Sequence, residues 1–249
     1  MRDNIINNTH RKRIFLMTDQ TSLKKLAGYR AAELVEDGMV VGIGSGSTIA
    51  YVIEALGKRV AEDGLKIKGV PTSDKTRRTA AKLGIPMHNV DDVDHIDITI
   101  DGADQIDENF AAIKGGGAAL LWEKIVAVNS KRNVWVVDGS KLSDHLTHYL
   151  PVEIIPYGAD QLFKRLEVKG YKPTWRLDQN GNPVRTDSAN YLIDLHLNKM
   201  PDPFTLGREL TSMVGVVEHG LFLNVVDQVI VGREDESIDI FDAHPLPLV

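Results

Sequence analysis

The sequence contains no cysteine, no long apolar run and no excess of basic residues. The absence of cysteine excludes disulfides, thiolate nucleophiles and cysteine-ligated metal sites. No apolar segment approaches the roughly 20 residues that a membrane-spanning helix needs. The net charge is −6, and the one basic cluster is residues 10–13, so we do not expect nucleic acid as the main partner. The eight histidines form no HExxH motif, and nothing else in the pattern requires a metal.

The first 20 residues do not resemble a secretory signal, because their apolar run, residues 14–17, is too short. We interpret residues 1–20 as a tail and expect a cytoplasmic location by default. The 249 residues are 43% hydrophobic and 26% charged, which is typical of a globular protein of one or two domains.

Helix-like and strand-like patterns alternate from residue 21 to about 150, which predicts an α/β domain with a mostly parallel sheet covered by helices. After Pro151 the order becomes strand, helix, strand, strand, helix, strand, with a hairpin about residues 178–183. Residues 221–231 are interpreted as a strand pair or as a return to the main sheet. We therefore predict a main domain over residues 21–150 plus 220–249 and a small α+β domain over residues 151–219.

Apolar and polar residues alternate from His95 to Asp101, which predicts a strand ending at Asp101, and Gly102 permits a sharp turn there. Ligands of open α/β sheets bind beyond the carboxyl ends of strands. Asp101 and Asp104 could bracket a polyol at such an edge, because carboxylates accept hydrogen bonds from hydroxyls. Taken alone, the two acids are better explained as a solvated acidic turn.

Lys114 and three glycines, residues 115–117, precede an apolar run over residues 118–128 that predicts a largely buried helix. The glycines indicate close backbone approach to a ligand, and the helix N-terminus beside Lys114 would attract an anion. Glu123 has only apolar neighbours three and four positions away, so burial should raise its pKa and suit it to act as a general base. The alternatives are a flexible loop and a structural ion pair.

Three further segments place polar groups after predicted strands. Residues 44–48 form a glycine-rich loop with hydroxyl groups, which is neither a dinucleotide-binding nor a P-loop motif. Residues 70–77 repeat the pattern, and residues 138–141 end in Lys141. Ordinary helix capping and turn chemistry explain each segment equally well, but their recurrence at one sheet edge favours a shared ligand.

Taken together in this order, the motifs GIGSGST, PTSDKTR, DGAD, KGGG, WEKI and DGSK resemble those of type A ribose-5-phosphate isomerases. The resemblance covers about residues 17–235. It implies interconversion of ribose 5-phosphate and ribulose 5-phosphate without a metal or other cofactor, in the non-oxidative pentose phosphate pathway. It also implies a Rossmann-like main domain, a smaller ferredoxin-like α+β domain, and a homodimer or homotetramer.

The resemblance assigns roles to residues of this chain. Glu123 would move a proton between C1 and C2 through an enediolate, and Lys114 with the following glycine amides would stabilise the oxyanion. Asp101 and Asp104 would bind hydroxyls and assist opening of the sugar ring. The lysines and hydroxyl residues of the substrate-binding set would chiefly hold the phosphate. The full set would be Lys24, Ser45, Gly46, Ser47, Thr48, Gly102, Ala103, Gly115, Gly116, Gly117 and Lys141.

The chain departs from the usual family pattern at three positions. Gln105 replaces an expected acid, Trp122 stands where Arg or Thr is common, and Gly139 replaces the acid of DESK, which would loosen the placement of Lys141. Family chains commonly begin near Met17, so residues 1–16 are interpreted as an extension or as lying before the true start.

Other functions of the same fold remain open at the level of sequence. A non-catalytic sugar-phosphate sensor would need a DNA-binding domain, for which a 20-residue tail is too short. An amino-sugar-phosphate deaminase is disfavoured by the lack of histidine near the DGAD loop. A CoA transferase would form a thioester on its glutamate, which mass spectrometry would detect.

Overall fold

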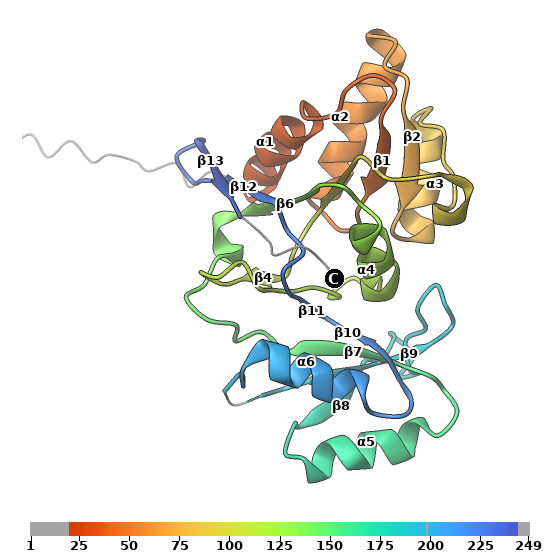
Figure 1. Ribbon diagram of the computed structural model, residues 1–249, viewed down its shortest axis with the longest axis vertical. Coiled ribbons are helices and arrows are strands. Elements are labelled where there is room, and N and C mark those ends of the chain that lie inside the picture. The colour runs from red at the N-terminus through yellow and green to blue at the C-terminus, as the bar shows by residue number, and fades with distance from the viewer. Residues whose placement is uncertain (1–19, 198, 244–249) are drawn as a thin grey trace, which may run out of the picture.

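The computed structural model describes residues 20–197 and 199–243 (Figure 1). The expected N-terminal tail and the expected start at Met17 lie outside these residues, except that Gln20 already belongs to the first helix. The helices are α1 Gln20–Ala32, α2 Ile49–Glu62, α3 Asp74–Lys82, α4 Leu120–Val128, α5 Ala159–Val168 and α6 Pro203–Thr211. The strands are β1 Val40–Ile43, β2 Lys68–Pro71, β3 Ile98–Asp101, β4 Gln105–Ile106, β5 Ala112–Ile113, β6 Asn133–Asp138, β7 Leu150–Ile154, β8 Pro173–Trp175, β9 Tyr191–Leu195, β10 Val216–His219, β11 Leu221–Phe222, β12 Gln228–Gly232 and β13 Ile238–Asp242. No helix among the described residues has the length and apolarity to span a membrane.

The main sheet has the order β13-β12-β6-β3-β1-β2, and only the edge strand β13 runs antiparallel to its neighbour. Val134 and Val136 of β6 pack in a core with α1 and α2, whereas Trp135 and Val137 pack on the opposite face with Ala127 of α4. Both faces of the sheet are therefore covered, as parallel sheets require. This confirms the predicted α/β class.

Two predicted elements differ in detail. Strand β3 begins only at Ile98, and all of its residues are buried despite the polar–apolar alternation. Thr99 can be buried because its hydroxyl forms a 2.6 Å hydrogen bond with the hydroxyl of Ser130. Helix α4 begins at Leu120 because Ala118 adopts a left-handed φ of 63°. The helix is also only half-buried, since Val128 on its outer face is 48% exposed.

The second sheet, in the lower part of Figure 1, has the order β10-β7-β9-β8 and is antiparallel throughout. Helices α5 and α6 share one core with it. The order strand, helix, strand, strand, helix, strand is the one predicted, and it is ferredoxin-like. The predicted turn near residue 180 exists, with the Asp178 amide donating to the Asn182 carbonyl at 2.8 Å, but only its first arm, β8, includes a regular strand.

A third sheet of two-residue strands, β11-β5-β4, lies between the two larger sheets and was not predicted. Such short strands have no readable periodicity. After β11 the chain returns to the main sheet as β12, parallel to β6, which agrees with one of the two interpretations of residues 221–231.

The site follows from the topology of the main sheet. From β1 the chain passes to β2 on one side, and from β3 it passes to β6 on the other. Open α/β sheets bind ligands where the strand order reverses in this way, because the loops there diverge and leave a crevice. The loops after β1 and β3 begin at Gly44 and Gly102, the two motifs singled out from the sequence.

Candidate active site

A pocket of about 120 Å³ lies at this switch point. It takes in every predicted site residue except Asp101. It is lined by Lys24, Ser45, Gly46, Ser47, Thr48, Gly102, Ala103, Asp104, Lys114, Gly115, Gly116, Gly117, Glu123 and Lys141. The described residues contain no group of three or more histidine, aspartate or glutamate side chains placed to hold a metal ion.

Glu123 lies in the first turn of α4 and is only 5% exposed. Its Oε2 atom is 3.4 Å from the Lys114 Nζ, yet it has no hydrogen-bond partner of good geometry among the described residues. Burial raises the pKa of Glu123 to about 8, against the pull of Lys114 and with a further push from the negative charge of Asp101. A carboxyl group that exchanges its proton near neutral pH is suited to general acid–base chemistry.

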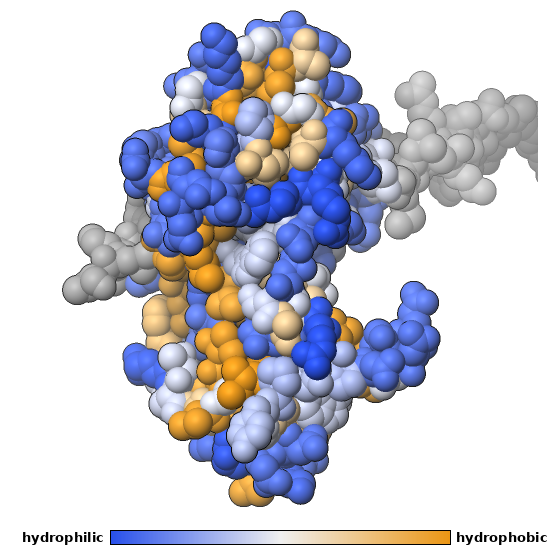
Figure 2. Space-filling view, turned by 90° about the vertical axis from the view of Figure 1, so that its right-hand side faces the viewer, coloured by the Kyte–Doolittle hydropathy of each residue, from blue (hydrophilic) through white to orange (hydrophobic). Residues whose placement is uncertain are grey.

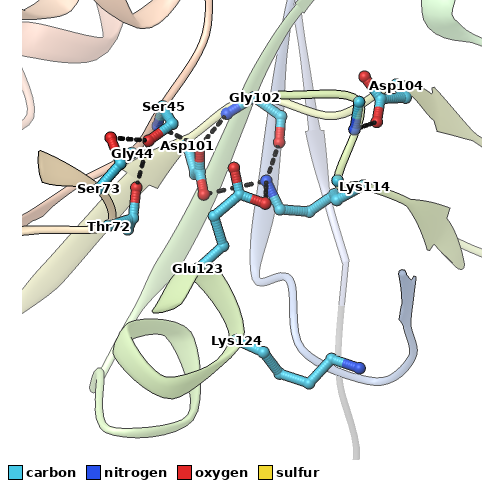
Figure 3. A network of polar contacts seen from close by, with 12 residues as sticks. Gly44, Ser45, Thr72, Ser73, Asp101, Gly102, Asp104, Lys114, Glu123 and Lys124 are labelled. Atoms are coloured by element: carbon cyan, nitrogen blue, oxygen red, sulfur yellow. Dashed lines mark hydrogen bonds and ion pairs between the residues drawn. The ribbon is translucent and has the colours of Figure 1, made fainter. Parts of the chain in front are cut away.

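Lys114 directly follows β5 and is 3% exposed. Figure 3 shows its Nζ directed at three oxygen atoms, which belong to Asp101, Glu123 and the Gly102 carbonyl. Burial alone would lower the pKa of Lys114, but the carboxylates of Asp101 and Glu123 outweigh it, and the pKa is raised. Lys114 is therefore a fixed positive charge inside the pocket.

Asp101, also 3% exposed, lies behind the pocket rather than along its wall. Its Oδ1 accepts hydrogen bonds from the amides of Ser45 at 3.0 Å and Gly102 at 2.7 Å, and its Oδ2 lies 2.9 Å from the Lys114 Nζ. A Cβ atom at Gly44 would lie 2.1 Å from Asp101 Oδ1, so only glycine allows the two segments to approach. The geometry directs Asp101 at Lys114 and away from a ligand.

Asp104 faces the pocket and shapes the glycine triplet. Its Oδ2 accepts from the Gly116 amide at 2.7 Å, so this N–H group is already engaged. The amides of Gly115 and Gly117 have no hydrogen-bond partner within the described residues. They are the two N–H groups of the triplet that a ligand can use without displacing Asp104.

Arg176, which follows β8 of the second sheet, also holds the glycine triplet, and the sequence analysis did not identify it. Its Nη1 donates to the Gly115 carbonyl at 2.6 Å, and its Nε donates to Asp194 Oδ2 at 2.9 Å. Arg176 precedes the predicted hairpin turn and is 61 positions from Gly115. No local pattern could have revealed this contact.

A second group of pocket residues is suited to an anion. Thr48 is the N-cap residue of α2 but makes no capping hydrogen bond with its side chain. Lys24 on α1 and Lys141 at the end of a 3-10 turn line the same pocket, and neither side chain forms an ion pair or a hydrogen bond with any described residue. A helix N-terminus with two unpaired cations is a strong anion site.

Figure 3 shows the hydroxyl of Ser45 directed at the hydroxyl groups of Thr72 and Ser73. It lies 2.8 Å from the hydroxyl oxygens of Thr72 and Ser73. Ser73 in turn caps α3 by accepting from the Thr76 amide at 3.1 Å. The PTSDKTR segment therefore supports the glycine-rich loop from behind and does not line the pocket.

These features define an α/β protein whose pocket joins an anion site to a buried acid–base pair. Residues 68–236 match the sequence model of the family described as Ribose 5-phosphate isomerase A (phosphoriboisomerase A). The ribose-5-phosphate isomerase A of Bifidobacterium adolescentis is 58% identical over 214 residues, which cover 86% of this chain and 92% of the relative. That of Levilactobacillus brevis is 54% identical over 218 residues, which cover 87% and 96%.

Solved structures agree with this match. Ribose 5-phosphate isomerase from Plasmodium falciparum superimposes with a TM-score of 0.85 at 34% identity, over 89% of this chain and 98% of that one. A D-ribose-5-phosphate isomerase in complex with phospho-erythronic acid gives 0.84 at 36% identity, over 88% and 97%. This chain belongs to the ribose 5-phosphate isomerase A family, which confirms the resemblance seen in its motifs.

Proposed function

We propose that this protein interconverts D-ribose 5-phosphate and D-ribulose 5-phosphate by proton transfer, with Glu123 as the base. Family membership supports the reaction. The observation that supports the residue assignment is the buried pair of Glu123 and Lys114, 3.4 Å apart, in a pocket that Lys24 and Lys141 also line.

The proposed reaction begins with the substrate phosphate at the N-terminus of α2, between Lys24 and Lys141. The C1–C2 end then reaches Glu123. Glu123 removes the proton from C2 of the open-chain aldose, and the C–H electron pair forms the C1=C2 double bond and leaves negative charge on O1. Lys114, a fixed cation, stabilises that charge.

The second half of the reaction returns the proton. Glu123 delivers it to C1, while a proton moves from O2 to O1 and O2 becomes the ketone oxygen. We assign the O2-to-O1 transfer to Asp104, because its carboxylate faces the pocket. Asp101 acts as a positioning residue through Lys114, and the family role of the two acids in ring opening stays a prediction.

The ligand of one solved relative supports an enediolate intermediate. Phospho-erythronic acid, named with that relative, carries a phosphate and a carboxylate. Because erythronic acid is one carbon shorter than ribose, its planar carboxylate takes the place of the C1–C2 unit and imitates the charge and shape of an enediolate. Analogues of this kind bind more tightly than substrates. We expect phospho-erythronic acid to inhibit this protein in competition with ribose 5-phosphate.

The test is conversion of ribose 5-phosphate by purified protein in EDTA, beside Glu123→Gln. Activity that survives chelation and is lost in the variant would support the proposal. A wild-type protein that binds ribose 5-phosphate without converting it would instead favour the sugar-phosphate sensor. The deaminase alternative is further disfavoured because no histidine lines the described pocket.

We also propose a homodimer or homotetramer, with the domain boundaries given above and a cytoplasmic location. Figure 2 shows one face on which apolar surface gathers in a band between polar regions. A groove between α4 and α6 includes Val128, Phe204 and Leu223. Large exposed apolar patches are uncommon on monomers. Light scattering during size-exclusion chromatography tests the oligomer, and a single 27.5 kDa species would contradict it.

A further inference from the structure

The two residues that flank Glu123 on α4 are both bonded to the small domain. Trp122 Nε1 donates to Ser188 Oγ at 2.9 Å. Lys124 Nζ donates to Glu218 Oε1 at 2.8 Å and to the His219 carbonyl at 2.7 Å. Successive side chains on an α-helix are about 100° apart, so these contacts lie on either side of Glu123. Together they resist rotation of α4 about its axis.

The Lys124 contact is largely buried, with 16% of its side chain exposed. Figure 3 shows Lys124 leaving α4 in a different direction from Glu123. Its Nζ lies 4.9 Å from the centre of the Phe222 ring, and Lys114 Nζ lies 5.2 Å from the centre of the same ring. A buried ion pair is costly to break on one side only, so this contact holds its geometry firmly.

The same chain segment, residues 218–222, also holds Lys114. The Lys114 amide donates to the Gly220 carbonyl at 2.9 Å, and a Cβ atom at Gly220 would lie 2.2 Å from the Lys114 carbonyl oxygen. This one segment therefore contacts both Lys114 and α4, the helix that bears Glu123. It sets where the two members of the acid–base pair lie.

The Ser188 contact is exposed, but the loop that carries Ser188 is anchored. Glu153, fully buried in β7, accepts from Thr186 Oγ1 at 2.8 Å and from Asn190 Nδ2 at 2.9 Å. Asp187 of the same loop accepts from the Asp74 amide of α3 at 2.7 Å. The loop is thus fixed at both ends and in its middle before it reaches Trp122.

We infer that Trp122 and Lys124 are positioning residues, through which the small domain holds α4 so that Glu123 meets Lys114 and the substrate. This inference rests on the proposed function, because it assigns the small domain a part in that reaction. Displacement of a reacting group by about 1 Å can reduce a rate by about 10²-fold, so the constraint has a measurable consequence.

The experiment compares Lys124→Met, Lys124→Arg and Ser188→Ala with a matched control, Lys169→Met. Lys169, which follows α5, forms a 2.6 Å ion pair with Glu209 on the surface of the small domain. We expect Lys124→Met to lower kcat by about 10- to 100-fold and Ser188→Ala by about 2- to 5-fold, with KM nearly unchanged. Lys124→Arg should recover much of the loss, and Lys169→Met should match the wild type.

Two arms keep the result interpretable. If Lys124→Met does not fold, the double variant Lys124→Met/Glu218→Leu is used in its place, because it removes both charges together. Hydrogen exchange of the α4 amides reports the constraint without any assay of activity, and we expect faster exchange in the Lys124 and Ser188 variants. Wild-type kcat together with wild-type exchange in these variants would overturn the inference. An inactive wild type with altered α4 exchange would instead refute only the proposed reaction.

Discussion

The proposed binding end and the proposed reactive end of the pocket differ in how their lysines are held. Lys24 and Lys141, which we assign to the phosphate, have no side-chain partner among the described residues, whereas Lys114, which we assign to the reaction, is buried against Asp101 and the Glu123 carboxyl. A solvated lysine exchanges water for a ligand, but a buried and paired lysine has its charge fixed before any ligand arrives. The first arrangement favours binding, and the second provides a preorganised field for a transition state.

The comparison is tested most strongly at Glu123. Glu123→Gln keeps the shape of the side chain but removes the base, so we expect kcat to fall by about 10²–10⁴-fold or more while substrate binding is largely kept. Steady-state kinetics with a separate measurement of ribose 5-phosphate affinity would show this. The control is Glu209→Gln, a partly buried carboxylate of the small domain that lines no part of the pocket. Normal turnover by Glu123→Gln would make Glu123 a structural residue.

Replacing Lys114 should affect both turnover and stability. Lys114→Met keeps most of the apolar stem but leaves Asp101 buried beside Glu123 without a cation. We expect kcat to fall by about 10²–10³-fold and the free energy of unfolding to fall by about 3–5 kcal/mol. Kinetics and urea denaturation test the two effects. Unchanged kinetics in folded protein would leave the free glycine amides as the whole oxyanion site.

The phosphate end should respond in KM instead. Lys141→Ala or Lys24→Ala removes one charged hydrogen bond to the phosphate, about 1.5 kcal/mol or a tenfold rise in KM, with kcat changed far less. The effect should shrink at high ionic strength, because exposed charges are screened. Lys169→Ala provides the control. A fall in kcat without a rise in KM would contradict the division of the pocket into a binding end and a reactive end.

The smallest effect concerns pH. Because burial raises the pKa of Glu123 to about 8, kcat/KM should rise with pH towards that value, as the base loses its proton. The apparent value belongs to the coupled pair of Glu123 and Lys114. A pH–rate profile of the wild type, flat from pH 6 to about 9, would contradict a base of raised pKa.

The same group should make stability depend on pH. Between its ordinary value of 4.5 and about 8, Glu123 keeps its proton in the folded state but loses it in the unfolded state. The folded state therefore binds more protons, and the contribution of Glu123 to the free energy of unfolding falls as pH rises. Glu123→Gln should flatten this dependence. An unchanged pH dependence of urea midpoints would show that Glu123 does not titrate in this range.

Local patterns predicted the residues of the reactive end better than their arrangement. Glu123 is an isolated acid in an apolar helix, and Lys114 precedes three glycines. Both patterns are local, because each depends only on residues within a few positions of the side chain concerned. The orientation of Asp101 depends on the Ser45 amide, 56 positions away, and on Lys114. The Lys124–Glu218 contact spans 94 positions. Contacts between residues so far apart in the sequence cannot be predicted from the periodicity of apolar and polar residues.

The fold shows the same limit. The parallel sheet and the order of elements after Pro151 were predictable, because most of these elements are long enough to show a period. Strands β4, β5 and β11 were not, since two residues cannot show a period. Yet β5 and β11 help to position Lys114 between the two larger sheets. The elements hardest to predict are those that join the domains at the site.

The most direct test of the proposed proton transfer is conversion of ribose 5-phosphate in D2O, followed by mass spectrometry of the product. A base that lifts a proton to form an enediolate exchanges it with solvent, so we predict deuterium at C1 of ribulose 5-phosphate and loss of both conversion and labelling in Glu123→Gln. Rapid conversion with no deuterium at C1, undiminished in Glu123→Gln, would point to direct hydride transfer and contradict the assignment of Glu123.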